Sequence, residues 1–380
     1  MVSSVAMPMK VSSIHSVVDL CQALVQIPSE NPSGSPASRG EEAIARFVGE
    51  FLESLGARVE YEEIGPARPN VYGLWPVPTG ANRRILFAPH LDTVTVEGMT
   101  VDPFLAKRLN QRLYGRGTSD TKGSMATMLW ALKSVDLSKL SVAVGFAGLA
   151  DEEFEQFGAK ACAARKMAEF VVVGEPTNLD VVYTHKGTAW LEIETEGKSV
   201  HASMPQTGVN AIDRMIDALK ILNERFPQIC PVQGDSMLGQ PTISTGRIRG
   251  GTKINVVPDR CYAEVDIRIL PGQESMAAAV TDFFQKQRIL ATVRPIKISA
   301  PLRTSPDHPF IQNFVALGSR LTAASWFCDA AFFALEGTPA IAIGPGSIAQ
   351  AHTADEFIEI AELERGAEFF TNFLHSFSNG

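Results

Sequence analysis

Histidines and carboxylates that stand beside short apolar segments are the residues of this chain best suited to chemistry. His90 follows the apolar run at residues 84–88. Glu175 follows the run at residues 170–173. The candidate metal ligands are His90, Asp120, Glu153, Glu175 and His352. Histidine and carboxylate ligands without cysteine suit a hydrolytic zinc, manganese or cobalt site better than a structural zinc site.

Each candidate also has a simpler structural explanation when it is taken alone. A lone His90 is compatible with a core or surface position. The acidic triplet at residues 151–153 is typical of a solvated helix start, where the helix dipole favours negative charge. Asp120 alone would serve as a helix N-cap. The coincidence of two histidines and several carboxylates at the ends of four apolar segments is what favours a metal centre.

Apolar segments alternate with helical ones towards both ends of the chain. Residues 41–55, for instance, place apolar side chains at helical spacing and are closed by Gly56. Strands are expected at residues 84–88, 141–149, 170–173 and 339–343, and further helices at 122–132, 158–168 and 310–321. This alternation predicts an α/β domain with a buried sheet. Ligands of open α/β sheets bind beyond the carboxyl ends of the strands, which is where the candidate metal ligands fall.

The middle of the chain has a different pattern. Strands are expected at residues 188–196, 242–248, 261–270 and 291–299, and helices at 210–222 and 274–287. The order strand, helix, strand, strand, helix, strand is that of the split βαβ arrangement. We therefore expect a small α+β domain at residues 184–299, inserted into a catalytic α/β domain formed by residues 1–183 and 300–380.

Composition narrows the classes of protein to which the chain can belong. Its 380 residues carry 42 acidic and 34 basic side chains, and the net charge of −8 argues against a broad nucleic-acid-binding face. No apolar stretch approaches the ~20 residues of a membrane span, so no membrane partner is expected. The five scattered cysteines indicate neither a disulfide framework nor a cysteine-based zinc site. The first residues lack the apolar core of a secretory signal, which makes the cytoplasm the expected location.

Five motifs carry a resemblance to a known family. They are HLDTV, GRGTSDTKG, ADEE, VGEPT and AHTADE, in this order along the chain. Together they closely resemble the motifs of the M20 family of dinuclear zinc amidohydrolases and peptidases. The resemblance implies a zinc-aminopeptidase-like α/β catalytic domain with an inserted ferredoxin-like α+β domain that acts as a lid and dimerisation module. It also implies two divalent metal ions, with zinc first and cobalt or manganese as alternatives, and a homodimer formed through the inserted domain.

The resemblance assigns a role to each candidate ligand. One ion would be held by His90, Asp120 and Glu175. The other would be held by Asp120, Glu153 and His352, so that Asp120 bridges both ions; in the family the peptide bond after this aspartate is cis. Glu152 would be the general base. Because neighbouring side chains on an extended strand point in opposite directions, Glu152 and Glu153 can divide their roles only if they lie in a turn.

Asp92 is expected to support a metal ligand because of its spacing. A metal-binding histidine usually donates its second ring N–H to a carboxylate or another acceptor, which fixes the tautomer of the ring. Asp92 lies two residues after His90 on an extended segment. Its side chain can therefore lie on the same side of the chain as the histidine and serve this purpose.

The inserted domain carries further residues that the resemblance links to catalysis. His201 lies in GKSVHASMP, which matches a family segment whose histidine enters the partner subunit's active site in dimeric members. Asn255 and Arg268 match positions that bind the carboxylate end of the substrate, for which the two parallel N–H donors of an arginine are suited. Gly346, in the segment GPGS before His352, would line the substrate pocket with backbone donors.

These roles imply hydrolysis of the amide bond in a small N-acyl amino acid or dipeptide-like substrate. The segments GEPT, HKG, GVNAI and GPGSIAQAH favour N-acetylornithine-type deacetylation, which releases acetate and the free amino acid. Residues 329–331 read Asp-Ala-Ala where Thr-Glu-Ala is usual in that group, which favours a broad aminoacylase or a glutamate-carboxypeptidase-like peptidase. Succinyl-diaminopimelate desuccinylation is a further alternative. A non-catalytic homologue is the least favoured reading, because no expected ligand is missing and the base is present.

Overall fold

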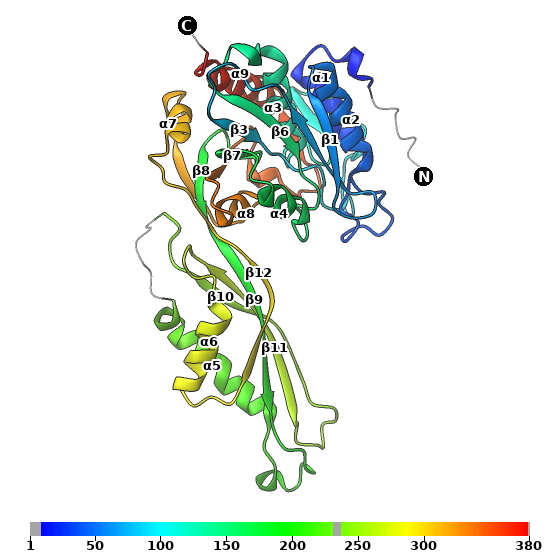
Figure 1. Cartoon of the computed structure of the whole chain (residues 1–380). Helices are drawn as coiled ribbons and strands as arrows, with labels where there is room; N and C mark the ends of the chain where they lie inside the picture. Colours follow the sequence, from blue (N-terminus) through cyan, green and yellow to red (C-terminus); the bar gives the residue numbers. More distant parts are fainter. Residues whose placement is uncertain (1–8, 231–236, 379–380) are drawn as a thin grey trace. The chain divides into compact units, whose positions relative to one another are not determined.

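The computed structural model describes residues 9–230 and 237–378 of the chain (Figure 1). The chain divides into two compact units. Unit 1 comprises Met1–Tyr183, Thr304–Thr322 and Cys328–Gly380, and unit 2 comprises Thr184–Arg303 and Ala323–Phe327. The chain therefore leaves unit 1 after Tyr183 and returns to it at Thr304.

A nine-stranded mixed sheet organises unit 1. Its strand order is β1 (Arg58–Glu63), β2 (Pro69–Leu74), β6 (Ala143–Gly148), β3 (Arg84–Phe87), β7 (Phe170–Val173), β15 (Ala340–Ala342), β8 (Val181–His185) and β13 (Leu302–Arg303), with β14 (Leu321–Ala324) paired to β8. The four central strands, β6, β3, β7 and β15, are parallel. Nearly all of their residues are buried, as expected for parallel strands that are covered on both faces.

Helices cover this sheet in two layers. One layer contains α1 (Val17–Val25), α2 (Glu42–Ser54), α3 (Lys122–Ser134), α7 (Pro309–Ala316) and α9 (Ile360–His375), and the other contains α4 (Phe157–Ala164) and α8 (Ala330–Leu335). α3 leads from β3 to β6 on one side, and α4 leads from β6 to β7 on the other side of β3. Because parallel crossovers are right-handed, α3 and α4 lie on opposite faces of the sheet. The topology therefore reverses at β3, and the carboxyl end of this strand is a favoured place for a ligand.

A small antiparallel sheet in unit 1 joins two distant parts of the chain. It contains β4 (Lys107–Leu109), β5 (Arg112–Tyr114) and β16 (Phe357–Glu359). β5 precedes the segment that carries Asp120, and β16 follows the segment that carries His352. The pairing therefore brings these two segments together.

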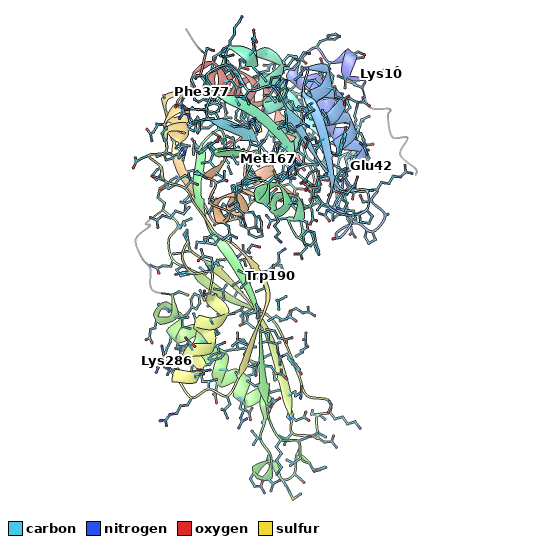
Figure 2. All side chains as sticks on the ribbon, in the orientation of Figure 1. Lys10, Glu42, Met167, Trp190, Lys286 and Phe377 are labelled. Carbon is cyan, nitrogen blue, oxygen red and sulfur yellow. The ribbon has the colours of Figure 1, made fainter. Side chains whose placement is uncertain are left out.

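Unit 2 is built on a four-stranded antiparallel sheet with the order β10 (Thr242–Gly250), β11 (Arg260–Ile269), β9 (Gly187–Glu196) and β12 (Thr292–Ser299). The helices α5 (Ala211–Ile229) and α6 (Met276–Lys286) share a core with this sheet (Figure 1). Along β9, Leu191 and Ile193 are buried, whereas Trp190 is 42% exposed (Figure 2). The two sheets confirm the expected fold class, a mixed α/β catalytic sheet with a separate ferredoxin-like α+β module. Among the described residues, none of the helices is both long and apolar enough to cross a membrane.

Some elements differ from those expected from the sequence. The helix expected at residues 310–321 ends at Ala316, because Gly318 has a left-handed backbone with φ of +101° and Leu321 then begins β14. The helix expected at residues 158–168 is α4, which ends at Ala164. The sequence pattern did not predict α1 or α9, although both have a buried face.

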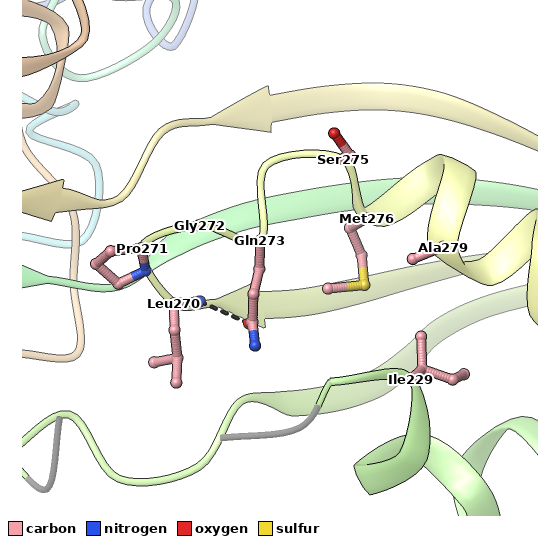
Figure 3. Close-up of a pocket in the computed structure, with 8 residues that line it drawn as sticks. All are labelled: Ile229, Leu270, Pro271, Gly272, Gln273, Ser275, Met276 and Ala279. Carbon is pink, nitrogen blue, oxygen red and sulfur yellow. Dashed lines mark hydrogen bonds between the residues drawn. The ribbon is translucent and has the colours of Figure 1, made fainter. Parts of the chain in front are cut away.

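A pocket of about 270 Å³ lies in unit 2 at the turn that joins β11 to α6 (Figure 3). Oε1 of Gln273 accepts the backbone N–H of Leu270 there at 2.9 Å. The lining residues are Ile229, Leu270, Pro271, Gly272, Gln273, Ser275, Met276 and Ala279. Since none of these side chains carries a carboxylate, an imidazole or a thiol, the candidate chemistry lies elsewhere.

An aromatic cluster joins α7 and α9 to the sheet of unit 1. Phe373 stacks on Phe314 with ring centroids 3.8 Å apart, and Phe370 meets Phe87 edge-on at 5.5 Å. All four rings are fully buried. The cluster therefore fixes the C-terminal helix against β3, the strand that leads to His90.

Replacing Phe373 by alanine should lower the free energy of unfolding by ~3–5 kcal/mol, because the change removes a buried ring and leaves a cavity. The measurement is the urea midpoint followed by circular dichroism. Phe157→Ala is the control, since that ring is 50% exposed and its loss should shift the midpoint far less. Equal shifts in the two variants would contradict the importance of the cluster.

Candidate metal centre

The carboxyl ends of three neighbouring parallel strands carry most of the candidate ligands. His90 stands three residues after β3 and forms a parallel bridge with Leu149, just beyond β6. Glu152 and Glu153 follow β6, and Glu175 follows β7. Because β6, β3 and β7 lie side by side, these side chains converge at one edge of the sheet.

Asp120 lies before α3 and faces two histidines at once. Its Oδ1 is 3.1 Å from Nε2 of His90, and its Oδ2 is 3.3 Å from Nε2 of His352. The same nitrogen of His352 is 3.2 Å from each carboxylate oxygen of Glu153. The peptide bond between Asp120 and Thr121 is cis. One carboxylate thus spans two histidines, which is the arrangement that a bridging ligand of two ions requires.

The ligand atoms form compact groups within which all atoms lie within 4.8 Å of one another. These groups are His90, Asp120 and Glu175; Asp120, Glu153 and His352; and His90, Glu152 and Glu153. The first two have the same members as the two expected ligand sets, whose occupation by metal stays a prediction. Oε1 of Glu175 is buried and has no hydrogen-bond partner among the residues that the structure describes. Imidazole nitrogens with carboxylate oxygens fit zinc, cobalt or manganese.

Like charges crowd this group of side chains and shift their pKa values. Desolvation raises the pKa of Glu152 and of Glu175 well above the ordinary value, and neighbouring carboxylates add to the rise. Burial opposes ionisation of Asp120 too, yet hydrogen bonds to the two histidines hold its pKa below the usual range. The pKa of His352 rises to about 10, because hydrogen bonds to carboxylates, led by Asp120, favour its protonated form. Divalent cations would relieve the same repulsion, so the electrostatics also fit metal ions.

Asp92 holds the turn that carries Glu152 and Glu153. Its Oδ1 accepts the backbone N–H of Glu152 at 2.9 Å, and its Oδ2 accepts that of Glu153 at 3.1 Å. The turn begins at Asp151, whose backbone is left-handed with φ of +72°. Nδ1 of His90 lies 2.9 Å from the backbone carbonyl of Asp92 and 3.5 Å from its carboxylate. The main-chain oxygen thus takes the closer histidine contact, and the carboxylate organises the turn.

Comparison with known proteins assigns this centre to a family. The profile of peptidase family M20/M25/M40 matches residues 86–376. The chain belongs to this family. It is 32% identical over 382 residues to an acetylornithine deacetylase of Yersinia pseudotuberculosis, an alignment that covers 95% of this chain and 97% of the relative.

Solved structures agree with this assignment at the level of the fold. Aminopeptidase PepT from Bacillus cereus has a TM-score of 0.75 at 21% identity, over 94% of this chain and 97% of that chain. The YXEP protein of Bacillus subtilis, a dinuclear metal-binding peptidase of the M20 family, has a TM-score of 0.68 at 15% identity, over 94% and 96%. The chain is therefore an M20 metallohydrolase, and its histidine and carboxylate groups are candidate metal sites.

Three expected site residues of this M20 enzyme lie in unit 2. His201 and Asn255 are close together there, since the N–H of Ala202 bonds to the carbonyl of Asn255 at 3.0 Å. His201 is exposed. Arg268 lies near the end of β11 and donates to Asp266 at 3.1 Å. Their roles at the metal centre stay predictions.

Gly346 lies in unit 1 beside the loop of Asp120. Its backbone is left-handed with φ of +81°, and a Cβ atom there would come within 2.9 Å of Oγ of Ser119. Its carbonyl accepts the N–H of Asn178 at 2.7 Å. Both the conformation and the close approach therefore require glycine at this position, while its contact with substrate stays a prediction.

Residues from distant parts of the chain support the acidic turn, and the sequence did not indicate them. Nδ2 of Asn31 donates to Asp92 at 2.8 Å and to Asp151 at 3.0 Å. Arg68 donates to both oxygens of Glu41 and reaches Asp151 at 2.7 Å. Asn31, Glu41 and Asp151 are all buried. Asp151, which precedes the two glutamates in ADEE, was the one local sign of this network. Nothing in the sequence indicated which residues contact it.

Glu356, the last residue of AHTADE, also has a supporting role that was not expected from the sequence. Its fully buried carboxylate accepts four hydrogen bonds of 2.8–3.1 Å. The donors are the backbone N–H groups of Gly117, Ser119 and Asp120 and the guanidinium of Arg116. Because Glu356 lies four residues after His352, one side chain fixes the loop of Asp120 to the segment of the second histidine.

Replacing Glu356 by alanine should weaken metal binding by ~10–100-fold, the usual effect of removing a group behind metal ligands. It should also lower stability by ~3–5 kcal/mol, because Arg116 loses its buried partner. Calorimetric titration of the metal-free protein with Zn²⁺ measures the first effect, and urea unfolding measures the second.

Glu359→Gln is the matched control for this experiment. Glu359 lies three residues further on, and its pair with Arg112 has side chains that are 37% and 40% exposed. Its loss should cost less than ~1 kcal/mol. An unchanged affinity for Zn²⁺ in Glu356→Ala would show that this carboxylate does not position the ligands.

Proposed function

We propose that this M20 enzyme removes the acyl group from N-acyl amino acids, with N-acetylornithine as the first candidate substrate and acetate and the free amino acid as products. The observation that carries the proposal is the position of Asp120, whose two oxygens face two different histidines in one carboxylate-rich cleft. The likeness to an acetylornithine deacetylase over nearly the whole chain supports this choice of substrate.

The proposed ligands form two sets that share Asp120. His90 and Glu175 complete the first set, and Glu153 and His352 complete the second. Divalent ions held by such sets, zinc first and cobalt or manganese as alternatives, polarise an amide carbonyl and acidify water. The residues of unit 1 would hold the ions, orient the substrate amide towards them and move the proton.

Glu152 is the proposed general base. It shares a compact group with His90 and Glu153 but belongs to neither of the two ligand sets. Desolvation raises its pKa, in the direction that a proton acceptor working near neutral pH requires. Glu152 would take a proton from the attacking water and pass it to the amine that leaves, so that the same residue accepts and then donates the proton.

Unit 2 suggests how a dimer would complete the site. Arg268 lies opposite Thr242 at one end of the β10–β11 hairpin, whereas the loop that contains Asn255 lies at the other end. At ~3.3 Å per residue, the two ends are roughly 25 Å apart. One small substrate cannot span that distance, which supports a dimer in which the two ends of the hairpin serve different metal centres.

A broader specificity for N-acyl amino acids is the second candidate function. The buried Asp329, whose Oδ1 is 3.3 Å from Nε2 of Gln156 in unit 1, belongs to the Asp-Ala-Ala stretch that departs from the Thr-Glu-Ala usual in the acetylornithine group. A panel of N-acetylornithine, N-acetylmethionine, N-succinyl-diaminopimelate and a dipeptide ending in glutamate distinguishes the alternatives. The compound with the highest kcat/KM identifies the substrate class.

Hydrolysis of an N-acyl amino acid should be measurable and should stop when a chelator removes bound metal. Glu152→Gln should keep its metal but lose at least ~100-fold in kcat, because acid–base catalysis by one group contributes ~10²–10⁴-fold. The measurements are amine release and metal content by plasma emission. Glu155→Gln is the matched control: it removes the same charge three residues later and lies in none of the ligand groups.

Two outcomes of this experiment would count against different parts of the proposal. A protein that binds no metal and hydrolyses no N-acyl amino acid would overturn the function as a whole. A fully active Glu152→Gln variant would leave the metallohydrolase class in place but refute the assignment of the base.

Mixing two inactive variants tests whether His201 acts across subunits. Glu152→Gln and His201→Ala should each be nearly inactive with unchanged metal content. In a mixed dimer one site has both residues intact, so random exchange of subunits should restore about a quarter of the wild-type activity. Absence of recovery after exchange has been confirmed would assign His201 to the site of its own subunit.

A further inference from the structure

Gln156 has a backbone conformation that glutamine seldom adopts. Its φ and ψ are 60° and 34°, in the left-handed region, directly before α4. Glycine adopts this conformation without strain, whereas other residues do so infrequently. The side chain of Gln156 is nonetheless buried, with 1% of the residue exposed. A residue held in this way, where glycine would be easier, indicates that the side chain has a function.

The amide nitrogen of Gln156 lies between two carboxyl groups. Nε2 is 3.4 Å from Oε1 of Glu152 and 3.3 Å from Oδ1 of Asp329. A glutamine amide nitrogen has two N–H donors, so it can donate to both acceptors at once. Both contacts are long for hydrogen bonds. They therefore restrain the carboxylate of Glu152 while leaving it able to take a proton.

Asp329 is the second carboxyl group that the amide of Gln156 contacts. It is fully buried directly before α8, yet its side chain caps no backbone N–H of that helix. Its Oδ1 instead accepts the amide of Gln156. Burial raises the pKa of Asp329 to about 8, so near neutral pH it adds little negative charge to a cleft that already holds several carboxylates.

We propose that Gln156 and Asp329 are positioning residues that set the orientation of the Glu152 carboxylate for proton transfer. Gln156 acts on Glu152 directly, and Asp329 acts through Gln156. The inference rests on the proposed function, in which Glu152 is the general base. Neither positioning residue needs to touch the substrate or a metal ion.

Two substitutions at Gln156 separate the amide donors from the backbone. Gln156→Met removes both donors and keeps the length of the side chain. Gln156→Gly also removes them but relieves the left-handed backbone. Both variants should lose about tenfold in kcat, the usual effect of one hydrogen bond, with KM and metal content unchanged. A kcat of Gln156→Met equal to the wild-type value would overturn the proposal.

Gln111 offers a matched control for the backbone effect. It too has a left-handed backbone, with φ of 62°, but it lies exposed in the turn between β4 and β5. Gln111→Gly should leave kcat unchanged. A comparable loss of kcat in Gln111→Gly would show that relief of left-handed backbones, rather than loss of the amide donors, lowers the activity, and would overturn the proposal.

Asp329 provides a rescue test. Asp329→Asn retains an acceptor oxygen for Gln156 and should keep most of the activity, whereas Asp329→Leu should lose kcat to the same extent as Gln156→Met. If the asparagine variant is as impaired as the leucine variant, the acceptor role is wrong.

A crystal structure of Gln156→Met tests the contact without relying on activity. The carboxylate of Glu152 should be displaced or should occupy two rotamers. An unmoved carboxylate would overturn the positioning role whatever the kinetics. If the wild-type protein hydrolyses no N-acyl amino acid, the proposed function fails instead, and this structural comparison alone decides whether Gln156 positions Glu152.

Discussion

Mutual repulsion among carboxylates is the constraint that the surroundings of the metal centre have to satisfy. Asp120 lies in one compact group with Glu175 and in another with Glu153, and each group spans less than 4.8 Å. Ionised carboxylates at such distances destabilise a folded protein unless cations or hydrogen-bond donors compensate them. The two histidines provide part of this compensation, and the charge that remains suits divalent cations.

A second layer of carboxylates positions the first mainly through backbone N–H groups. Asp92 accepts two backbone N–H groups of the acidic turn, and Glu356 accepts three of the Asp120 loop. Backbone N–H groups fix a loop without adding a full positive charge that would compete with a metal ion. Lys122 likewise adds less than a full positive charge. It is fully buried, its Nζ donates to the carbonyl of Ile27 at 2.8 Å, and burial lowers its pKa to about 7.

The sequence indicated the candidate ligands and the nearby support from Asp92, but not the supporting residues that lie far away in the chain, and the physical reason is this separation. His90 and Glu175 were recognisable because ligands of α/β sheets follow strands, and strands are local patterns. Asn31 and Arg68 act on Asp151, which lies 120 and 83 residues away, and no local pattern encodes such a pairing.

The expected limits of some helices were wrong for a related reason. α7 ends at Ala316, and four residues separate it from Leu321, where β14 begins; helical periodicity extended across this break made the expected helix too long. α9 was missed although its buried residues Leu363, Ala367, Phe370 and Phe373 fall at helical spacing. The pattern alone does not say that β3 and α7 supply the aromatic partners of this face. The partners that bury the apolar face of such a helix are present only in the folded chain.

Substrate identity is harder to predict than reaction class because the two depend on different parts of the chain. Every N-acyl amino acid presents the same amide, so the centre around Asp120 has little to distinguish one acyl donor or side chain from another. Discrimination requires contacts with the variable ends of the substrate, where one buried polar contact changes selectivity far more than one methylene does. The role proposed for Arg268 concerns a carboxylate that all these substrates share. The residues that read the side chain must therefore lie outside the motifs that identify the family, which is why those motifs determine the chemistry and leave the substrate to be measured.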